Sequence, residues 1–327
     1  MRGVMIALAV VASACGSTSP TAPSAPPVVA LATPPSLATI TGHVTATNGG
    51  QPLGGLSASL GALTTTTDGS GTFSAQTAPA FSTTLRLTGA SIVPRALTLA
   101  ASTSREVGVT AITLNGSFDL NFYRQLVRNG AEAPATLQPL RRWTRTPQIY
   151  LKTVDEGGEV IHGPTLDLIE ATVKDAIPRW TSGILGTPSV ERGTGTREGV
   201  AGWLTIKFPA TTVLLDSGSC GRAQIGLEGG WIELGYHGAM ANGGTCRTAT
   251  AVIAPHVVRH EIGHALGFYH TDRPGDLMYR SSWLSPTGLP ADRERSHAAI
   301  AYARPVGNVD PDSDPTATVN LAPMRAQ

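Results

Sequence analysis

Three histidines and one glutamate lie within a single stretch of eleven residues, His260 to His270. His260 and His264 are four positions apart, so on a helix their Cβ atoms lie about 5–6 Å from each other on one face. Both rings can then aim a nitrogen at one ion, and imidazole nitrogen is a common zinc ligand. Glu261 points away from this pair, which suits a base that takes a proton from water better than a third ligand.

The third histidine follows a predicted turn. Gly267 lies three residues after His264, where a helix can end in the left-handed conformation that glycine adopts at little cost. The chain can fold back there, so that His270 becomes a third ligand. Three neutral imidazoles leave the fourth tetrahedral position free for water, which is typical of a catalytic rather than a structural zinc site. His256 cannot replace one of the three, because a rise of 1.5 Å per residue puts it about 12 Å from His264.

The pattern H-E-x-x-H-x-x-G-x-x-H with Leu277-Met278-Tyr279 downstream resembles the metzincin zinc peptidases, and most of all their matrixin branch. The resemblance implies one catalytic zinc ion on the three histidines, with Glu261 as the general base. It also implies that Met278 forms a turn beneath the zinc and that Tyr279 shapes the pocket for the residue after the cut bond. In astacin-like relatives a tyrosine touches the metal two places after that methionine, but Arg280 stands there in this sequence.

Other features of the matrixin branch are not expected here. We find no match to its calcium and second-zinc loops, and no cysteine that resembles its latency switch. Asp310, Asp312 and Asp314 stand among prolines, without the glycine and the terminal glutamate of a calcium loop.

The N-terminal residues 1–15 are typical of an export signal. Met1-Arg2 is followed by an apolar run to Ala14 that is too short to span a bilayer as a stable helix. Ala12-Ser13-Ala14-Cys15 resembles a bacterial lipobox, which implies a lipid on Cys15 and a place in the cell envelope, such as the outer membrane. Ordinary cleavage nearby would instead give a freely secreted protein.

Two further cysteines, Cys220 and Cys246, lie beside glycine-rich loops. In an exported chain the default for such a pair is a disulfide, which would stabilise the fold by roughly 3–4 kcal/mol. Their use as zinc ligands is less favoured, because the histidines already complete a site.

The first half of the chain predicts a small separate domain. Residues 16–38 are rich in proline, serine and threonine and indicate an extended linker. From 39 to 114, short alternating runs between turns predict an antiparallel β-sandwich without helices. The stretch Thr67–Phe73 makes this region similar to carboxypeptidase regulatory-like or immunoglobulin-like sandwiches, a resemblance that names a fold without a function. His43 is expected to be an ordinary strand residue.

Residues 115–147 predict a short helix, with an apolar face from Phe118 to Val127, and a linker. The catalytic domain is expected over residues 148–305, and the resulting fold class is α+β, with a twisted mixed sheet and about three helices. Strands are predicted at Ile149–Val154, Trp203–Phe208, Ala223–Leu227 and Trp231–Leu234, and helices at Thr165–Trp180 and Pro290–Ala303 besides the histidine helix.

By the resemblance, Ala223–Leu227 is the edge strand that accepts a substrate peptide as an extra strand. His297 on the closing helix is expected to be structural. The tail, residues 306–327, is predicted to be disordered.

Other functions stay open from the sequence. A sandwich joined to a zinc domain fits a surface protein that binds cell-wall or host material without cutting it, although a structural zinc would need no base such as Glu261. A hydrolase of non-peptide bonds would share the metal chemistry and differ only in pocket shape. A net charge of +1 without a polybasic run gives no argument for nucleic acid. The expected partner is a protein or peptide substrate, the expected contact with a membrane is only through the lipid on Cys15, and the expected state is a monomer.

Overall fold

The structure is a computed structural model that describes residues 37–77, 82–101, 104–209, 219–236, 246 and 253–326. The export signal, Cys15 and nearly all of the predicted linker lie outside these residues and stay predictions. In the described part of the chain, no helix is long and apolar enough to cross a membrane.

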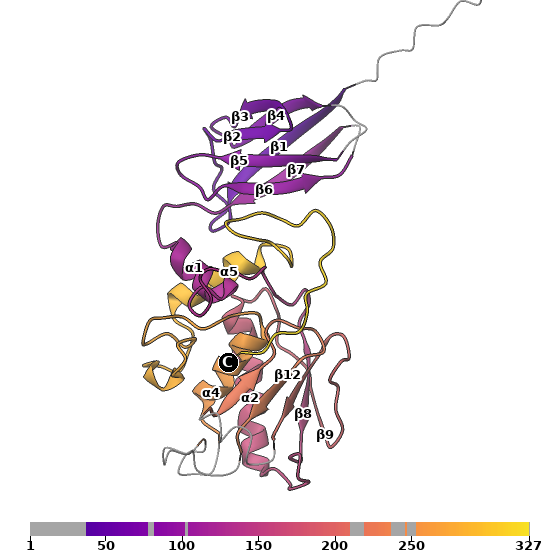
Figure 1. Cartoon of the computed structure of the whole chain (residues 1–327), viewed down its shortest axis with the longest axis vertical. Coiled ribbons are helices and arrows are strands. Elements are labelled where there is room, and N and C mark those ends of the chain that lie inside the picture. The colour runs from indigo at the N-terminus through magenta and orange to yellow at the C-terminus, as the bar shows by residue number, and fades with distance from the viewer. Residues whose placement is uncertain are drawn as a thin grey trace, which may run out of the picture. The chain divides into compact units, whose positions relative to one another are not determined.

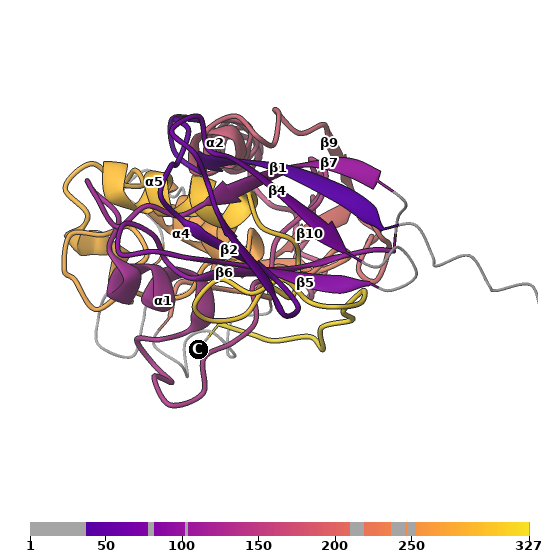
Figure 2. The ribbon, with the colours of Figure 1, turned by 90° about the horizontal axis from the view of Figure 1, so that it is seen from above.

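Seven strands form two sheets in the N-terminal region (Figures 1 and 2). One sheet has the order β4-β1-β7 and the other the order β3-β2-β5-β6. The strands are β1 (Ala38–Ala46), β2 (Ser57–Leu60), β3 (Leu63–Thr66), β4 (Thr72–Thr77), β5 (Thr83–Thr88), β6 (Arg95–Leu99) and β7 (Ser104–Ala111). Alternate residues of β1, such as Ile40 and Val44, are buried in one hydrophobic core with Leu85 and Leu87 of β5, as the period of two in a strand requires.

One pairing differs from the antiparallel sandwich that the sequence predicts. β1 and β7 run parallel, with Thr39 opposite Ser104 and Ala46 opposite Ala111. A parallel pair needs a long connection, and here the chain between the two strands passes through the second sheet. Alternating burial is the same in parallel and antiparallel strands, so the sequence pattern could not distinguish them.

The helix predicted after the sandwich is α1 (Leu120–Arg128). It begins at Leu120 because the Asp119 side chain accepts hydrogen bonds from the amides of Asn121 and Phe122. It ends at Asn129, which adopts a left-handed φ of 59°. The loop that follows α1 supplies one residue of the site described below.

A five-stranded mixed sheet with the order β11-β12-β10-β8-β9 organises the second region. Its parallel strands are β8 (Gln148–Lys152), β9 (Val190–Gly193), β10 (Trp203–Lys207) and β12 (Trp231–Leu234), while β11 (Gly221–Ala223) is antiparallel to β12 at one edge. The mixed α+β architecture predicted from the sequence is thus confirmed. The predicted edge strand is shifted, because β11 ends at Ala223 and Gly226 interrupts the extended chain with a φ of 51°.

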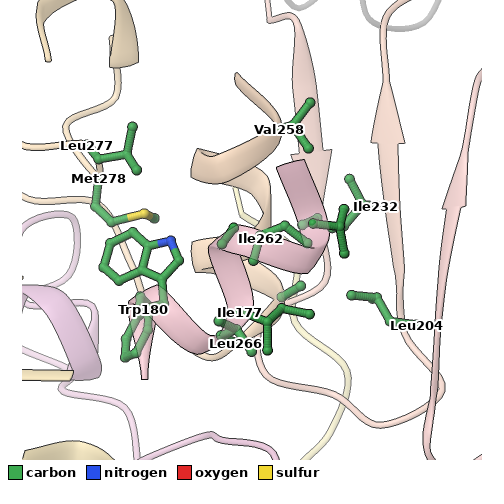
Figure 3. Close-up of a cluster of buried hydrophobic side chains, with 14 of the residues drawn as sticks. Ile177, Trp180, Leu204, Ile232, Val258, Ile262, Leu266, Leu277 and Met278 are labelled. Carbon is green, nitrogen blue, oxygen red and sulfur yellow. The ribbon is translucent and has the colours of Figure 1, made fainter. Parts of the chain in front are cut away.

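Three helices accompany this sheet, namely α2 (Gly163–Trp180), α4 (Pro255–Ala265) and α5 (Asp292–Tyr302). The predicted cap Thr165 is instead buried inside the first turn of α2. α2 and α4 contact each other, and α4 also contacts β11 and β12. Figure 3 shows the buried side chains that fill the space between them, including Ile177 of α2, Ile262 of α4 and Ile232 of β12. The histidine helix is therefore fixed between the sheet edge and a second helix.

The prediction of a disordered tail is wrong around Asn308 and Asp312, whose side chains are buried in the protein. Asp312 is fully buried, and its carboxylate accepts hydrogen bonds from Arg304 at 2.7 and 2.8 Å, from Arg95 at 3.1 Å and from Asn308 at 3.0 Å. Aspartates among prolines predict a solvated chain, because the sequence does not show that Arg95 and Arg304 contact them.

Candidate metal centre

Two of the three histidines lie on α4. The helix begins at Pro255, a position where proline costs no hydrogen bond, and runs to Ala265. His260 and His264 are one turn apart, and their ring centroids are separated by 4.7 Å. Both side chains are buried, with exposed fractions of 6% and 2%. Helical spacing thus places them as the sequence predicts.

The chain turns at Gly267, which has a φ of 111°, and this turn brings His270 back toward the other two histidines. A Cβ atom at this position would lie 2.1 Å from the carbonyl oxygen of Arg141, so a side chain is excluded by space as well as by backbone conformation. After the turn, the Tyr269 amide donates to the carbonyl of Leu126 at 2.7 Å. This contact fixes the chain just before His270.

The Nε2 atoms of the three histidines converge on one point. They are 3.2 Å apart between His264 and His270, and 3.3 Å apart between His260 and His270. Nitrogens placed about 2.1 Å from one ion at tetrahedral angles would be about 3.4 Å apart. The structure therefore brings His260, His264 and His270 together in a geometry that fits a single zinc ion.

The second ring nitrogen of each histidine is held by an acceptor. The Nδ1 atom of His260 donates to the carbonyl oxygen of Leu277 at 2.6 Å, and that of His264 to the carbonyl oxygen of Phe268 at 2.8 Å. Because a carbonyl only accepts, the proton is on Nδ1 and the lone pair of Nε2 is free. Burial lowers the pKa of His260 to about 3 and that of His264 well below its usual value. Both rings are neutral, as metal ligands must be.

Glu132 orients the third ring and was not predicted from the sequence. Its Oε1 atom accepts a hydrogen bond from Nδ1 of His270 at 2.6 Å, and this bond lowers the pKa of the carboxyl group. A carboxylate behind a ligating histidine fixes the ring and raises its basicity. The two residues are 138 positions apart, and a lone glutamate in a linker carries no spacing that could have revealed it.

Glu261 faces the same cavity from α4. Its side chain is 4% exposed, and burial raises its pKa to about 8. Among the described residues, its Oε2 atom has no hydrogen-bond partner. A Cβ atom at Gly221 of β11 would come within 2.6 Å of its Oε1 atom, so glycine there makes room for the carboxylate. A buried, unpaired carboxylate oxygen beside three bare imidazole nitrogens fits a site that holds a metal and a water molecule.

Met278 packs beneath the histidine helix. Its sulfur lies 2.5 Å from the position that a Cβ atom of Gly263 would take, and the Trp180 ring lies beside it (Figure 3). The turn is held by Glu294 of α5, whose carboxylate accepts the amides of Met278 at 2.8 Å and Leu277 at 3.1 Å. The carbonyl of Leu277 in turn orients His260, so this turn supports the ligands from below.

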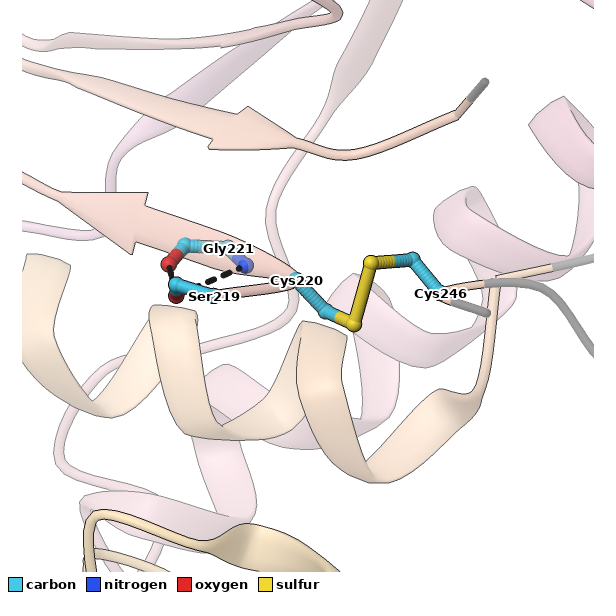
Figure 4. Close-up of a disulfide and its surroundings, with 4 residues drawn as sticks. All are labelled: Ser219, Cys220, Gly221 and Cys246. Carbon is cyan, nitrogen blue, oxygen red and sulfur yellow. Dashed lines mark hydrogen bonds between the residues drawn. A yellow bond between two sulfur atoms is a disulfide. The ribbon is translucent and has the colours of Figure 1, made fainter. Parts of the chain in front are cut away.

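A cavity of about 420 Å³ opens above the histidines. It is lined by Ser219, Cys220, Gly221, Arg222, Val257, His260, Glu261, His264, His270, Arg280, Ser281, Ser282, Trp283 and Ala326. The four residues that follow Tyr279 thus form part of the cavity wall, but Tyr279 itself is not among the lining residues. The role of Tyr279 in substrate binding stays a prediction. The predicted disulfide Cys220–Cys246 is present and fixes the chain directly before β11 (Figure 4).

His256 and His297 have contacts outside the histidine cluster. His256 packs on the Trp283 ring, with ring centroids 4.8 Å apart. His297 of α5 donates from Nδ1 to the Arg293 carbonyl and accepts the Asp119 amide at Nε2. Both ring nitrogens of His297 are thereby used within the protein.

Comparison with known proteins gives one family match. Residues 199–290, a minority of the chain, match the Matrixin family of peptidases. The matched segment contains the three histidines, Glu261 and Met278. No curated protein matches this chain.

One similar solved structure is a type II cohesin–X-dockerin complex from Acetivibrio cellulolyticus, with 16% identity and a TM-score of 0.21. The match covers 25% of this chain and 61% of that chain. A likeness at this TM-score carries no argument about fold or function.

Proposed function

We propose that this protein is a zinc-dependent endopeptidase. The observation that carries the proposal is the convergence of three imidazoles, with Nε2 atoms 3.2–3.3 Å apart, beside a buried carboxylate with an unpaired oxygen. The Matrixin match over residues 199–290 supports the same chemistry. The finer assignment, internal cleavage of polypeptides, rests on the open cavity and on the sheet edge beside it.

His260, His264 and His270 would hold the zinc ion, which when bound supplies a Lewis acid and lowers the pKa of a coordinated water toward about 7. Glu261 accepts the proton of the attacking water at Oε2 and returns it to the nitrogen of the leaving amine. The Glu261 side chain is buried, and the absence of a side chain at Gly221 leaves room for its carboxylate beside the histidines.

The substrate is proposed to bind as an extended strand. β11 is an edge strand of the sheet, and its residue Gly221 lines the cavity with the histidines. A peptide added to such an edge is bound through its main chain, and pockets for alternate side chains then give specificity. The exposed side chain of Trp283 also lines this cavity and offers an apolar surface to a substrate.

A surface protein that only binds its target is favoured less. Burying a carboxylate with an unpaired oxygen costs free energy, and a structural zinc site has no use for it. The unpaired oxygen of Glu261 therefore favours catalysis over binding alone.

The experiment compares the wild-type protein with the variants Glu261→Ala and His264→Ala. We expect Glu261→Ala to retain zinc and to lose cleavage of a denatured protein mixture by about 10²–10⁴-fold, whereas His264→Ala loses both. Cleavage by wild type should also stop with a zinc chelator. Equal rates for wild type and Glu261→Ala would refute the proposal.

We also propose that the chain is exported and carries a lipid on Cys15. The support is the apolar run before Ala12-Ser13-Ala14-Cys15. Mass spectrometry of the mature N-terminus, with Cys15→Ser as the control, should find a diacylglycerol adduct only in the wild type. An unmodified mature end at another residue would contradict lipidation.

A further inference from the structure

The last described segment, Pro323–Ala326, lies along the sheet edge next to the histidines. The Ile225 amide donates to the Met324 carbonyl at 2.8 Å, and the Ala326 amide donates to the Ala223 carbonyl at 3.0 Å. These bonds flank an antiparallel bridge between Gln224 and Arg325. This is the hydrogen-bond pattern of an antiparallel ladder. The segment thus continues the sheet as an added strand beyond β11.

The side chains of the segment alternate as in an extended peptide. Met324 accepts a hydrogen bond at its sulfur from the Tyr269 hydroxyl at 3.5 Å. Ala326 lines the cavity that contains the three histidines and Glu261. Arg325 is exposed, and its guanidinium lies 5.3 Å from the centroid of the Trp231 ring.

The segment also borders a second cavity of about 300 Å³. Met324 and Ala326 share the lining of this cavity with His264, His270 and Glu132. His264 and His270 line both cavities. A stretch of the chain that borders both cavities lies where a peptide bound to the sheet edge would pass the metal site.

The segment is kept near this edge by the residues before it. Asp312 is buried against Arg304 and Arg95, and Asp314 pairs with Arg95, so the chain is fixed at residues 312–314. Only eight residues separate Asp314 from Pro323. A tether of this length gives an effective concentration on the order of millimolar, so even a weakly held segment is bound much of the time.

We propose that Pro323–Ala326 is an intramolecular inhibitor that occupies the peptide-binding edge as an antiparallel strand. The proposal rests on the proposed peptidase function, because a substrate that adds to the same edge must first displace the segment. Two main-chain hydrogen bonds and the Tyr269–Met324 contact hold the segment. Because so few contacts hold it, a substrate can displace it, and the inhibition is competitive and partial.

The test uses the full-length, zinc-loaded chain with Ala326→Pro. Proline removes the amide that donates to Ala223, and the preceding Arg325 already has the extended conformation that proline favours. We expect KM for a peptide substrate to fall by about 3- to 30-fold, with kcat unchanged, because the catalytic groups are untouched. Ala322→Pro, directly before the segment and outside the ladder, is the matched control, and Ala326→Ser, which keeps the amide, should retain the wild-type KM.

A second readout does not depend on activity. Hydrogen exchange of the Ile225 amide should be slow in wild type, Ala322→Pro and Ala326→Ser, and at least about tenfold faster in Ala326→Pro, because its acceptor Met324 has left. Unchanged exchange, or an unchanged KM in an active enzyme, would overturn the proposal. If no variant cleaves peptides while the exchange still responds, the peptidase function fails and the inhibitory role fails with it, but the added strand is upheld.

Discussion

Each of the three clustered histidines has a defined acceptor for its Nδ1 proton, and each acceptor comes from a different part of the chain. Leu277 belongs to the methionine turn, Phe268 to the turn after α4, and Glu132 to the loop after α1. Glu132 is the only side chain among these three acceptors. The site thus depends on a residue outside the segment that matches the Matrixin family.

We predict that Glu132→Ala weakens zinc binding. Without the carboxylate, the His270 ring loses both its fixed orientation and part of its basicity, and such losses typically cost 10–100-fold in metal affinity. Competition with a chromophoric chelator measures the dissociation constant. Glu191→Ala, which removes a surface partner of Arg197, is the control. Equal affinities for Glu132→Ala and the control would show that Glu132 does not position the ligand.

We predict a pH-dependent stability difference at Glu261. Burial raises its pKa from 4.5 to about 8 in the folded protein. A group with a raised pKa contributes stability that is fully present below its unfolded pKa and is lost as the pH rises through the folded pKa. Glu261→Gln keeps a neutral side chain at every pH. In metal-free protein, wild type should therefore lose stability relative to Glu261→Gln between pH 5 and pH 9.

We expect the difference in unfolding free energy between the two proteins to change by a few kcal/mol, in order of magnitude, between pH 5 and pH 9. Urea unfolding of both proteins at pH 5, 7 and 9, in the presence of a chelator, measures it. A constant difference across this range would mean that the Glu261 carboxyl titrates as it does in an exposed position.

The sequence predicts the site residues whose positions follow from short-range spacing, and it misses the residues that reach the site from another part of the chain. His260 and His264 share one helix face, and Gly267 marks the turn to His270, so the spatial cluster follows from short-range spacing. Glu132 and Glu294 reach the site across 138 and 16 residues from His270 and Met278, through side chains with no recurrent spacing. Whether the clustered histidines bind zinc in solution stays a prediction.

At the scale of elements, the turn after α4 determines where the third histidine lies. Gly267 is required for two separate reasons, its φ of 111° and the 2.1 Å approach of a Cβ atom to the Arg141 carbonyl. The second reason arises from the linker before β8, which packs against the turn. The glycine therefore couples the linker to the metal site.

We predict that Gly267→Ala costs more stability than Gly158→Ala. Gly158 has a φ of 89° but open space around its Cβ position, so alanine there incurs only the conformational cost of about 1–2 kcal/mol. Gly267→Ala incurs the same cost and must in addition displace the Arg141 backbone. Urea unfolding measures both free energies. Equal losses for the two variants would show that the close approach does not matter.

The edge strand shows that a sequence pattern does not identify the partner with which a strand pairs. The apolar and polar residues of Ala223–Leu227 alternate as in a strand, yet β11 ends at Ala223, and Gln224 forms a bridge with Arg325 on the outer side of the sheet. Alternation indicates an extended chain without identifying its partner. The parallel pairing of β1 with β7 was missed for the same reason.

At the scale of the whole molecule, Asp312 joins segments that are far apart in the sequence. Its partner Arg304 follows α5 and also donates to Thr47 and Thr110, which lie next to β1 and in β7. A second partner, Arg95, begins β6. One buried carboxylate thus connects the two N-terminal sheets to the chain that follows α5.

We predict that Asp312→Ala destabilises the protein by about 3–5 kcal/mol, because it leaves the buried guanidinium of Arg304 without its carboxylate. Asp310→Ala is the matched control, since Asp310 pairs with Arg124 in a partly exposed position where ion pairs contribute about 0–1 kcal/mol. Urea unfolding measures both losses. Similar values for the two variants would contradict the anchoring role of Asp312.

The central claim is that three imidazole nitrogens hold one zinc ion and leave one position for water. The X-ray absorption spectrum of the zinc-loaded protein tests this most directly. We predict a first shell of three imidazole nitrogens and one further oxygen, all about 2.0–2.1 Å from the metal. A shell that contains sulfur, or a fourth protein ligand in place of the water oxygen, would contradict the account.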